Sequence, residues 1–336
     1  MAAVRMRSLR KAAKAEESKM VRPTEFGIQT APQHVSYAEL LAIWQTAERE
    51  GLDHAWTFDH FIPIFSDPTG PCMEGWTVLT ALLSQVPRIR GGTLVTGNSY
   101  RHPAVLANIA STLDVISGGR LEMGIGAGWW EMEYDAYGID FPHISERIYQ
   151  MEEGLQVMKA LWTETRANFA GKFYTITDAF CEPKPIQKPH IPIWVGGGGP
   201  QLTLRAVARH ADGWNTFLQP REDYTQLLGA LEKHCQTVGR DPSTIRNSLA
   251  APLVIDTDPA KLEAKLEAVA KARAGTPEEV RKRALVGTPD EIASQISSLG
   301  ELGVDHVILS LRAPYDHDEL ALFAREVIPA VRKAGF

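Results

Sequence analysis

The segment LEMGIGAGWW, residues 121–130, decides the expected fold class of this chain. An apolar run ends in glycines at alternate positions, Gly124, Gly126 and Gly128, and two tryptophans follow. This pattern predicts a buried strand whose last residues let a flat ligand approach the backbone. The glycines do not form the dinucleotide-binding fingerprint, and we expect no capped helix directly after them.

Strands and amphipathic helices are expected to alternate on both sides of this segment. The other strands are expected near residues 25–30, 54–58, 90–96, 192–195, 213–217, 248–255 and 305–310. This order predicts an α/β protein with a parallel sheet, and eight units favour a (β/α)8 TIM barrel with insertions. A Rossmann-like arrangement of two halves is the alternative.

The chain is interpreted as one domain with additions. We expect residues 1–22 to form a mobile N-terminal arm and residues 23–336 to form a single barrel domain. Residues 165–190 combine a hairpin pattern with a proline-rich stretch, which indicates an insertion between barrel units. The charged residues 259–283 are expected to form one or two exposed helices, a second excursion of the chain from the barrel.

Composition narrows the functions to be considered. The net charge of −6 and the absence of a large basic block argue against a nucleic-acid partner. No apolar run is long enough to span a bilayer, so we expect no membrane partner. The three cysteines lie far apart and match neither a metal nor a disulfide pattern, which fits a cytoplasmic enzyme without a metal.

Polar residues at the ends of the predicted strands are the candidates for chemistry, because active sites of such barrels lie there. His60 is the proton-transfer candidate, since imidazole titrates near neutrality and the preceding Asp59 is placed to orient it. The alternative is that Asp59 caps a turn and His60 is an ordinary hydrogen-bonding residue. Asn98 lies just past the third strand.

The run Gly196–Gly199 precedes a helix expected at residues 201–210. Free backbone amides and the positive end of that helix are suited to bind a phosphate. A flexible turn without a ligand is the alternative. Four tryptophans near strand ends, Trp56, Trp129, Trp130 and Trp214, are suited to enclose a planar ring, although each also fits a core position.

Several ordered motifs carry a family resemblance. They are TFDH at 57–60, the segment from Gly92 to Pro142, ERIYQMEEGLQVMKALW at 146–162, PKPIQKPHIPIWVGGGGP at 183–200 and ADGWN at 211–215. Together they closely resemble the bacterial luciferase-like monooxygenase superfamily, and within it the coenzyme F420-dependent oxidoreductase branch. The resemblance implies a barrel that carries the deazaflavin across its strand ends, and a homodimer.

The resemblance also assigns a cofactor site. It implies a non-prolyl cis peptide at Thr93–Leu94 in strand three, behind the ring. The expected cofactor-binding residues are Thr93, Leu94, Thr96, Ala127, Gly128, Trp129, Gly196, Gly197, Gly198 and Gly199. Relatives that oxidise a sugar phosphate carry a catalytic glutamate just after the strand-four glycines, whereas this chain has Trp129-Trp130 there.

The resulting hypothesis is hydride transfer between coenzyme F420 and a small organic substrate, which the sequence does not identify. His60, oriented by Asp59, would transfer the proton, and Asn98 would assist by hydrogen bonding. Basic residues near the barrel mouth, such as Arg101 or Arg205, would suit the acidic tail of F420. The alternatives are a reduced-FMN-dependent monooxygenase and a flavin-binding barrel without turnover.

Overall fold

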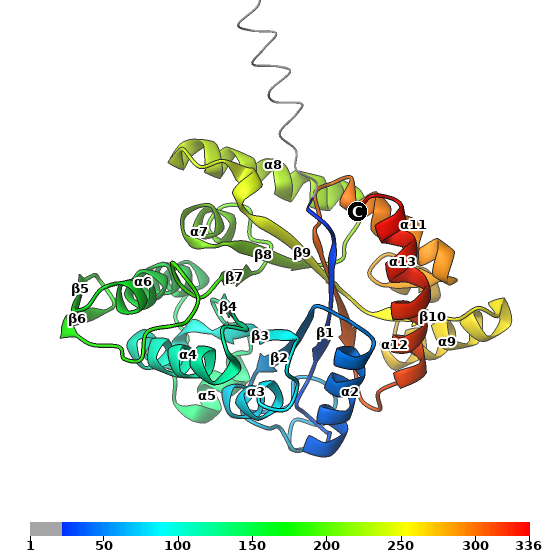
Figure 1. Cartoon of the computed structure of the whole chain (residues 1–336), viewed down its shortest axis with the longest axis horizontal. Helices are drawn as coiled ribbons and strands as arrows, with labels where there is room; N and C mark the ends of the chain where they lie inside the picture. Colours follow the sequence, from blue (N-terminus) through cyan, green and yellow to red (C-terminus); the bar gives the residue numbers. More distant parts are fainter. Residues whose placement is uncertain (1–21) are drawn as a thin grey trace, which may run out of the picture.

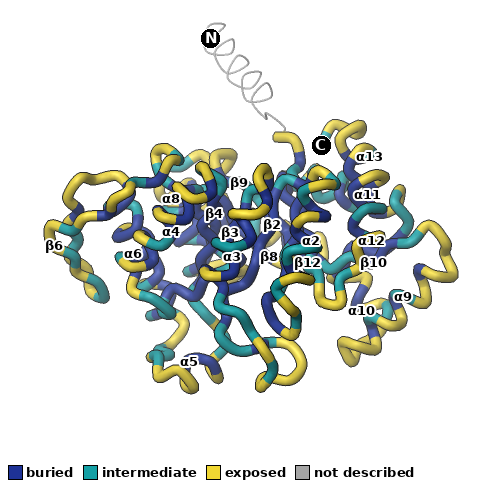
Figure 2. The backbone as a smooth tube through the Cα atoms, turned by 60° about the horizontal axis from the view of Figure 1, so that its bottom comes forward, coloured by how far each residue is buried: buried dark blue, intermediate teal, exposed yellow. Residues whose placement is uncertain are grey.

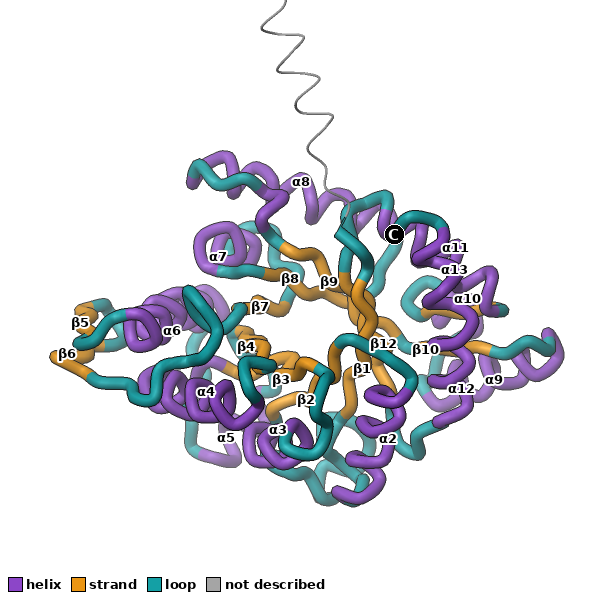
Figure 3. Tube along the Cα trace, in the orientation of Figure 1, coloured by secondary structure: helices purple, strands orange, loops and turns teal. Residues whose placement is uncertain are grey.

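The computed structural model describes residues 22–336, and its centre is a closed barrel of parallel strands (Figure 1). The strands follow one another around the barrel in the order β1, β12, β9, β8, β7, β4, β3 and β2. Neighbouring strands are joined through helices on the outside, as Figure 3 shows by colour. The closed order confirms the predicted (β/α)8 barrel and rules out the open two-halved sheet.

The strand and helix bounds agree with the predicted alternation. The barrel strands are β1 Glu25–Thr30, β2 His54–Asp59, β3 Arg90–Gly97, β4 Leu121–Gly126, β7 Ile193–Gly196, β8 Gly213–Phe217, β9 Arg246–Ala251 and β12 His306–Leu311. The covering helices are α2 Tyr37–Arg49, α3 Gly75–Leu83, α4 Pro103–Ser117, α6 Ile144–Thr163, α7 Thr203–His210, α8 Arg221–Val238, α11 Pro289–Gly300, α12 His317–Leu322 and α13 Ile328–Lys333. Three short elements complete this set, namely η1 Asn98–Tyr100, η2 Pro242–Thr244 and the π-helical turn η3 Phe323–Val327.

Two additions project from the barrel. Strands β5 Ala167–Ala170 and β6 Thr175–Ala179 form an antiparallel hairpin beside α6, inside the segment predicted as an insertion (Figure 1). Helices α9 Pro259–Ala272 and α10 Pro277–Arg281 occupy the predicted second excursion. The barrel lies between these helices and the hairpin, so the two additions extend from different sides of it.

The prediction of a single strand at 248–255 is wrong, because the chain forms two strands there. Strand β9 ends at Ala251, and after Pro252 the chain forms β10 Leu253–Ile255, which pairs with β11 Leu285–Gly287 outside the barrel. Proline has no N–H to donate to a ladder. The Pro252 carbonyl instead accepts a hydrogen bond from Leu285 N at 2.9 Å, which starts the second small sheet.

The core has an inner and an outer part. Inside the barrel Trp56, Leu94, Trp194, Ala250 and Ile308 pack together. A larger cluster fills the space between the strands and the surrounding helices, so the strands are dark blue at the centre of Figure 2. Both faces of the sheet are therefore covered, as expected for an all-parallel barrel.

The larger apolar residues of α4 do not all face the core. Of Val105, Ile109, Leu113 and Ile116, only Leu113 is fully buried. Val105 is 56% exposed and Ile116 51% exposed, because α4 turns its small residues toward the barrel instead.

The predicted arm lies almost entirely outside the described residues. Only Arg22 is described, and its Nη2 donates to the Ser243 carbonyl at 2.9 Å. Within residues 22–336 no helix has both the length and the apolar character that crossing a bilayer requires.

Candidate active site

The wall of the barrel is irregular in β3, next to the predicted site. Between Thr93 and Thr96, β3 contains one residue more than either of its neighbours, β2 or β4. Such a bulge redirects the side chains that follow it, and bulges are common next to active sites. The cis peptide that the resemblance placed at Thr93–Leu94 is instead at Leu94–Val95, one residue later.

The bulge presents Val95 at the carboxyl end of the barrel. A Cβ atom built on Gly126 would lie 2.8 Å from Val95 Cγ2, and one built on Gly196 would lie 2.8 Å from Val95 Cγ1. Both contacts are shorter than real side chains make, so these two positions accommodate Val95 because they are glycine. Val95 thus packs over the backbone of β4 at Gly126 and of β7 at Gly196, and we name these three residues the glycine floor.

The predicted ring contacts in β3 do not face the barrel mouth with their side chains. Thr93 Oγ1 donates to the Gly124 carbonyl at 3.1 Å and lies 2.8 Å from Thr96 Oγ1. Thr96 Oγ1 also accepts from Trp76 Nε1 at 2.9 Å. Leu94 belongs to the inner core, and its carbonyl accepts from Gln29 Nε2 at 2.7 Å. The added residue of the bulge explains why Val95, which we did not predict, takes their place at the mouth.

His60 is held by a buried carboxylate, but not by the one we expected. Its Nδ1 lies 2.7 Å from Glu133 Oε2, and Glu133 is fully buried. Tyr100 donates its hydroxyl to the same oxygen at 2.5 Å. The other oxygen, Oε1, accepts the backbone N–H groups of Phe61 and Ile62.

These four donors determine the charge of Glu133 and the tautomer of His60. Burial raises the pKa of the Glu133 carboxyl, but the hydrogen bonds from His60 and Tyr100 outweigh it and the pKa is lowered overall. Glu133 is therefore ionised at neutral pH, and His60 donates its proton from Nδ1. Among the described residues, Nε2 of His60 has no hydrogen-bond partner, so it is left as the acceptor.

Glu133 is the site residue that the sequence interpretation missed. It lies on α5 Glu131–Tyr137, a short helix for which the sequence analysis gave no prediction. Two signals were available, namely two glutamates in its first turn and Gly138 directly after its last turn. Tyr100 belongs to η1, directly after β3, and was also missed.

Asp59 has a different partner from the one predicted. Both of its carboxylate oxygens accept from Arg101, at 2.6 and 3.0 Å, and a second Arg101 bond goes to Glu74. Burial lowers the pKa of the Arg101 guanidinium, but the two carboxylates outweigh burial and raise it overall. Asp59 thus joins the end of β2 to the start of α4 and does not orient His60, so its predicted positioning role is wrong.

Asn98 is directed away from His60. Its Nδ2 donates to the Tyr174 hydroxyl of the hairpin at 3.1 Å. Its Oδ1 faces α6, where a Cβ built on Gly154 would lie 2.4 Å from it. Asn98 therefore connects η1 to the hairpin, and the structure does not bring it together with His60 and Glu133.

The glycine run after β7 is exposed and lies beside the glycine floor. Gly197, Gly198 and Gly199 are exposed, and Gly197 has a φ of +125°, which side-chain-bearing residues rarely adopt. The helix after the run, α7, begins at Thr203 rather than Gln201. The Gly197 amide already donates to the Asn215 carbonyl at 3.0 Å, so the amides of Gly198 and Gly199 and the α7 terminus are the groups that fit a phosphate.

The four tryptophans divide into two pairs. Trp56 and Trp214 are fully buried in the core, and Trp214 Nε1 donates to the Gly197 carbonyl at 2.7 Å. Trp129 is 58% exposed, and its ring centroid lies 5.9 Å from that of His60. Trp130 lies edge-on to Trp129 at 4.9 Å. Only the second pair is placed to border a ligand at the barrel mouth.

The other predicted contacts lie beside the same surface. Ala127 is partly buried, and Gly128 has a φ of +79° and faces the Tyr134 hydroxyl. The basic residues that we considered for an acidic tail are already paired. Arg101 binds Asp59, and Arg205 donates to Glu152 at 2.7 Å.

A cluster at the opposite, amino end of the barrel has donor atoms typical of metal ligands. Donor atoms of Glu25, His54 and His306 lie within 4.8 Å of one another. However, Arg246 Nη1 is 2.7 Å from Glu25 Oε2, and burial keeps the pKa of His306 well below its usual range. A guanidinium already neutralises the only carboxylate, so we assign no metal to this cluster.

Comparison with known proteins gives a consistent family. The model of the luciferase-like monooxygenase family matches residues 17–306. An F420-dependent glucose-6-phosphate dehydrogenase from Kineococcus radiotolerans is 30% identical over 92% of this chain and 98% of its own length. A relative of the same name from Segniliparus rotundus is 29% identical with the same coverage.

Solved structures agree at the level of the fold. An F420-dependent secondary alcohol dehydrogenase, solved with an F420–acetone adduct, superposes with a TM-score of 0.80 at 23% identity, covering 92% of this chain and 99% of that one. A monooxygenase from Streptomyces bottropensis gives a TM-score of 0.77 at 24% identity, covering 93% and 100%. Together with the family match over most of the sequence, these findings show that the chain belongs to the luciferase-like monooxygenase family.

Proposed function

We propose that this protein is a coenzyme F420-dependent oxidoreductase that interconverts an alcohol and a carbonyl compound. When bound, F420 accepts or supplies the hydride on a ring carbon. The observation that carries the proposal is the His60–Glu133 pair, which leaves an imidazole acceptor directly after the carboxyl end of β2. The sequence relatives that are named F420-dependent dehydrogenases support the choice of cofactor.

The residues at the barrel mouth fit a flat cofactor with a phosphate. The Val95 side chain lies over the backbones of Gly126 and Gly196, and a planar ring would rest against this glycine floor. The amides of Gly198 and Gly199, in the loop directly after β7, would hold the phosphate. Trp129 would border the ring from the side of β4.

The proton is handled by the chain's own residues. Ionised Glu133 fixes the proton of His60 on Nδ1, so Nε2 accepts the hydroxyl proton when the alcohol is oxidised. The imidazolium that forms is stabilised by the buried carboxylate. In the reverse direction the same Nε2 returns the proton to the carbonyl oxygen.

The substrate is proposed only as a class. The two sequence relatives named above are called glucose-6-phosphate dehydrogenases, but this chain has Trp129 after the strand-four glycines. Phe61 and Tyr137 pack together near the site, with ring centroids 4.7 Å apart. These aromatic residues favour a hydroxy compound with an apolar part over a bare sugar phosphate.

Titration of the purified protein with F420 and, separately, with FMN tests the cofactor. Each chromophore is followed by fluorescence in its oxidised and reduced forms. Tight F420 binding with negligible FMN binding would support the proposal and justify a screen of apolar alcohols and sugar phosphates. Preference for FMN, with oxygen consumption on adding reduced flavin, would instead indicate a monooxygenase. Binding of neither would refute the cofactor assignment.

We also propose a cytoplasmic homodimer, on the family resemblance. The three free thiols, Cys72, Cys181 and Cys235, support a reducing compartment. Light scattering coupled to size-exclusion chromatography tests the oligomeric state. A mass near twice 37.1 kDa supports the dimer, and a mass near 37.1 kDa contradicts it.

A further inference from the structure

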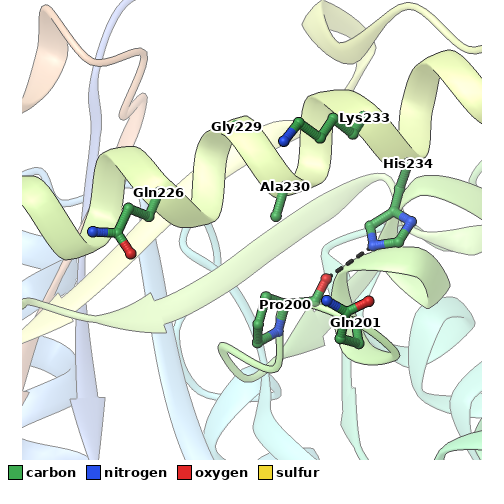
Figure 4. Close-up of a pocket in the computed structure, with 7 residues that line it drawn as sticks. All are labelled: Pro200, Gln201, Gln226, Gly229, Ala230, Lys233 and His234. Atoms are coloured by element: carbon green, nitrogen blue, oxygen red, sulfur yellow. Dashed lines mark hydrogen bonds between the residues drawn. The ribbon is translucent and has the colours of Figure 1, made fainter.

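A cavity lies next to the glycine run, on the side of α8. Its volume is ≈ 460 Å³, and it begins directly after Gly199. The residues that line it are Pro200, Gln201, Gln226, Gly229, Ala230, Lys233 and His234 (Figure 4). The first two belong to the loop before α7, and the others lie on one face of α8. The cavity is therefore continuous with the phosphate-binding position proposed above.

Lys233 supplies a free positive charge at this cavity. Its side chain is exposed and runs along α8 toward Gly229 (Figure 4). Among the described residues, no carboxylate forms a salt bridge with it. The adjacent His234 connects the two sides of the cavity, α8 and the loop before α7, since its Nε2 lies 2.9 Å from the Pro200 carbonyl oxygen.

Gly229 leaves the α8 side of the cavity without a side chain at this position. A Cβ built on Gly229 would meet no atom within 4 Å, so packing does not require glycine at this position. Glycine is less favourable than alanine in a helix interior, and Gly229 lies in the middle of α8 Arg221–Val238. Its presence leaves backbone and space exposed beside Lys233, four residues later on the same face.

We propose that this cavity binds the oligoglutamyl tail of F420, with Lys233 as its cationic contact. The proposal rests on the function proposed above. Beyond its phosphate, F420 continues as a lactyl chain that carries glutamates with free carboxylates, whereas FMN ends at the phosphate. A phosphate on the glycine run would place the next groups at Pro200, where the cavity begins. Carboxylates are the groups that an unpaired lysine recognises.

The test measures dissociation constants by fluorescence for F420 preparations with no glutamate, two glutamates and five or more. We expect the wild-type protein to bind the longer forms about 3- to 10-fold more tightly than the form without glutamate, as one or two exposed ion pairs allow. The Lys233→Glu variant should lose this dependence on length and bind the form without glutamate within about 2-fold of the wild type. High salt should also reduce the dependence.

Two further variants control the experiment. Gly229→Glu places a carboxylate in the cavity and should weaken only the long forms, while Gly229→Ala should bind all forms as the wild type does. Lys271→Ala removes an exposed lysine at the end of α9 and should change nothing.

The outcomes separate this inference from the proposed function. Tight binding that is independent of tail length, or Lys233→Glu weakening all forms equally, overturns the tail site alone. Failure of the wild-type protein to bind any form of F420 overturns the proposed function and the tail site with it.

Discussion

The most informative perturbation of the site is Glu133→Gln, because the two oxygens of Glu133 have separate tasks. Oε1 accepts from the backbone of Phe61 and Ile62, and a glutamine oxygen would keep both bonds. Oε2 accepts from His60 and Tyr100, where the glutamine would present an amide N–H₂ instead. His60 Nδ1 must then accept a hydrogen bond, so its proton moves to Nε2.

The magnitudes follow from the contacts that change. Two hydrogen bonds to a charged oxygen become neutral ones, which lowers the free energy of unfolding by about 1–2 kcal/mol. The variant should therefore fold. The acceptor at Nε2 is lost, however, and loss of a general base lowers the rate of proton-coupled hydride transfer by about 100- to 10,000-fold. F420 affinity should stay within about 3-fold, since Glu133 does not border the glycine floor.

Two assays read this change. Nitrogen-15 NMR of histidine-labelled protein reports the His60 tautomer without any substrate, and we expect Nδ1–H in the wild type and Nε2–H in the variant. Single-turnover absorbance of F420 with an alcohol substrate reports the rate. Glu131→Gln, an exposed glutamate of the same helix turn, is the matched control and should change neither signal.

A specific result would refute the reasoning. If Glu133→Gln switches the tautomer but reduces F420 at the wild-type rate, His60 does not transfer the proton. If the tautomer is unchanged, the buried pair does not set the protonation of His60.

Four other predictions follow from the structure. His60→Ala should keep F420 affinity and lose at least about 100-fold in turnover; full turnover would remove His60 from the mechanism. Gly126→Ala would place a Cβ 2.8 Å from Val95, so we expect a loss of about 1–3 kcal/mol in urea unfolding and weaker F420 binding; unchanged values would contradict the glycine floor. Arg101→Met leaves the buried Asp59 unpaired and should destabilise by about 3–5 kcal/mol, measured as a lower urea midpoint; a neutral effect would show that the pair is not structural. Burial and the nearby Lys159 and Arg209 lower the pKa of His210 from 6.5 to about 4. The unfolded chain therefore binds this proton first, and stability should fall by up to about 1.4 kcal/mol per pH unit from pH 6.5 down to 4; His210→Gln should reduce that slope, and an equal slope would refute the assignment.

Much of the fold was accessible from the sequence, because it depends on local periodicity. The strands at 25–30 and 213–217 have the predicted bounds, since buried parallel strands are short apolar runs between turn signals. The start of α2 is also determined locally, by the capping box at Ser36. The division of this apolar run into β9 and β10 at Pro252 was missed, although a proline can signal such a break. The run becomes two strands because β10 pairs with β11, which is distant in the sequence.

The site was predictable in location and only partly in detail. Strand ends meet at one edge of a barrel, so His60 and the glycines of β4 and β7 could be grouped without a structure. Trp129, also a candidate, has its ring centroid 5.9 Å from that of His60. The partner of His60 could not be found in this way, because Glu133 is 73 residues away and comes from a helix outside the barrel repeat.

Local patterns in the sequence were enough to predict the alternation of strands and helices and to single out the glycines and His60 as candidates, because each depends on residues that are close in the chain. Which side chains meet depends on the tertiary structure. The extra residue in β3 places Val95, rather than Thr93 or Leu94, at the barrel mouth. Arg101 binds Asp59, and His60 binds Glu133. These outcomes follow from register and burial, which are properties of the closed barrel rather than of any local pattern.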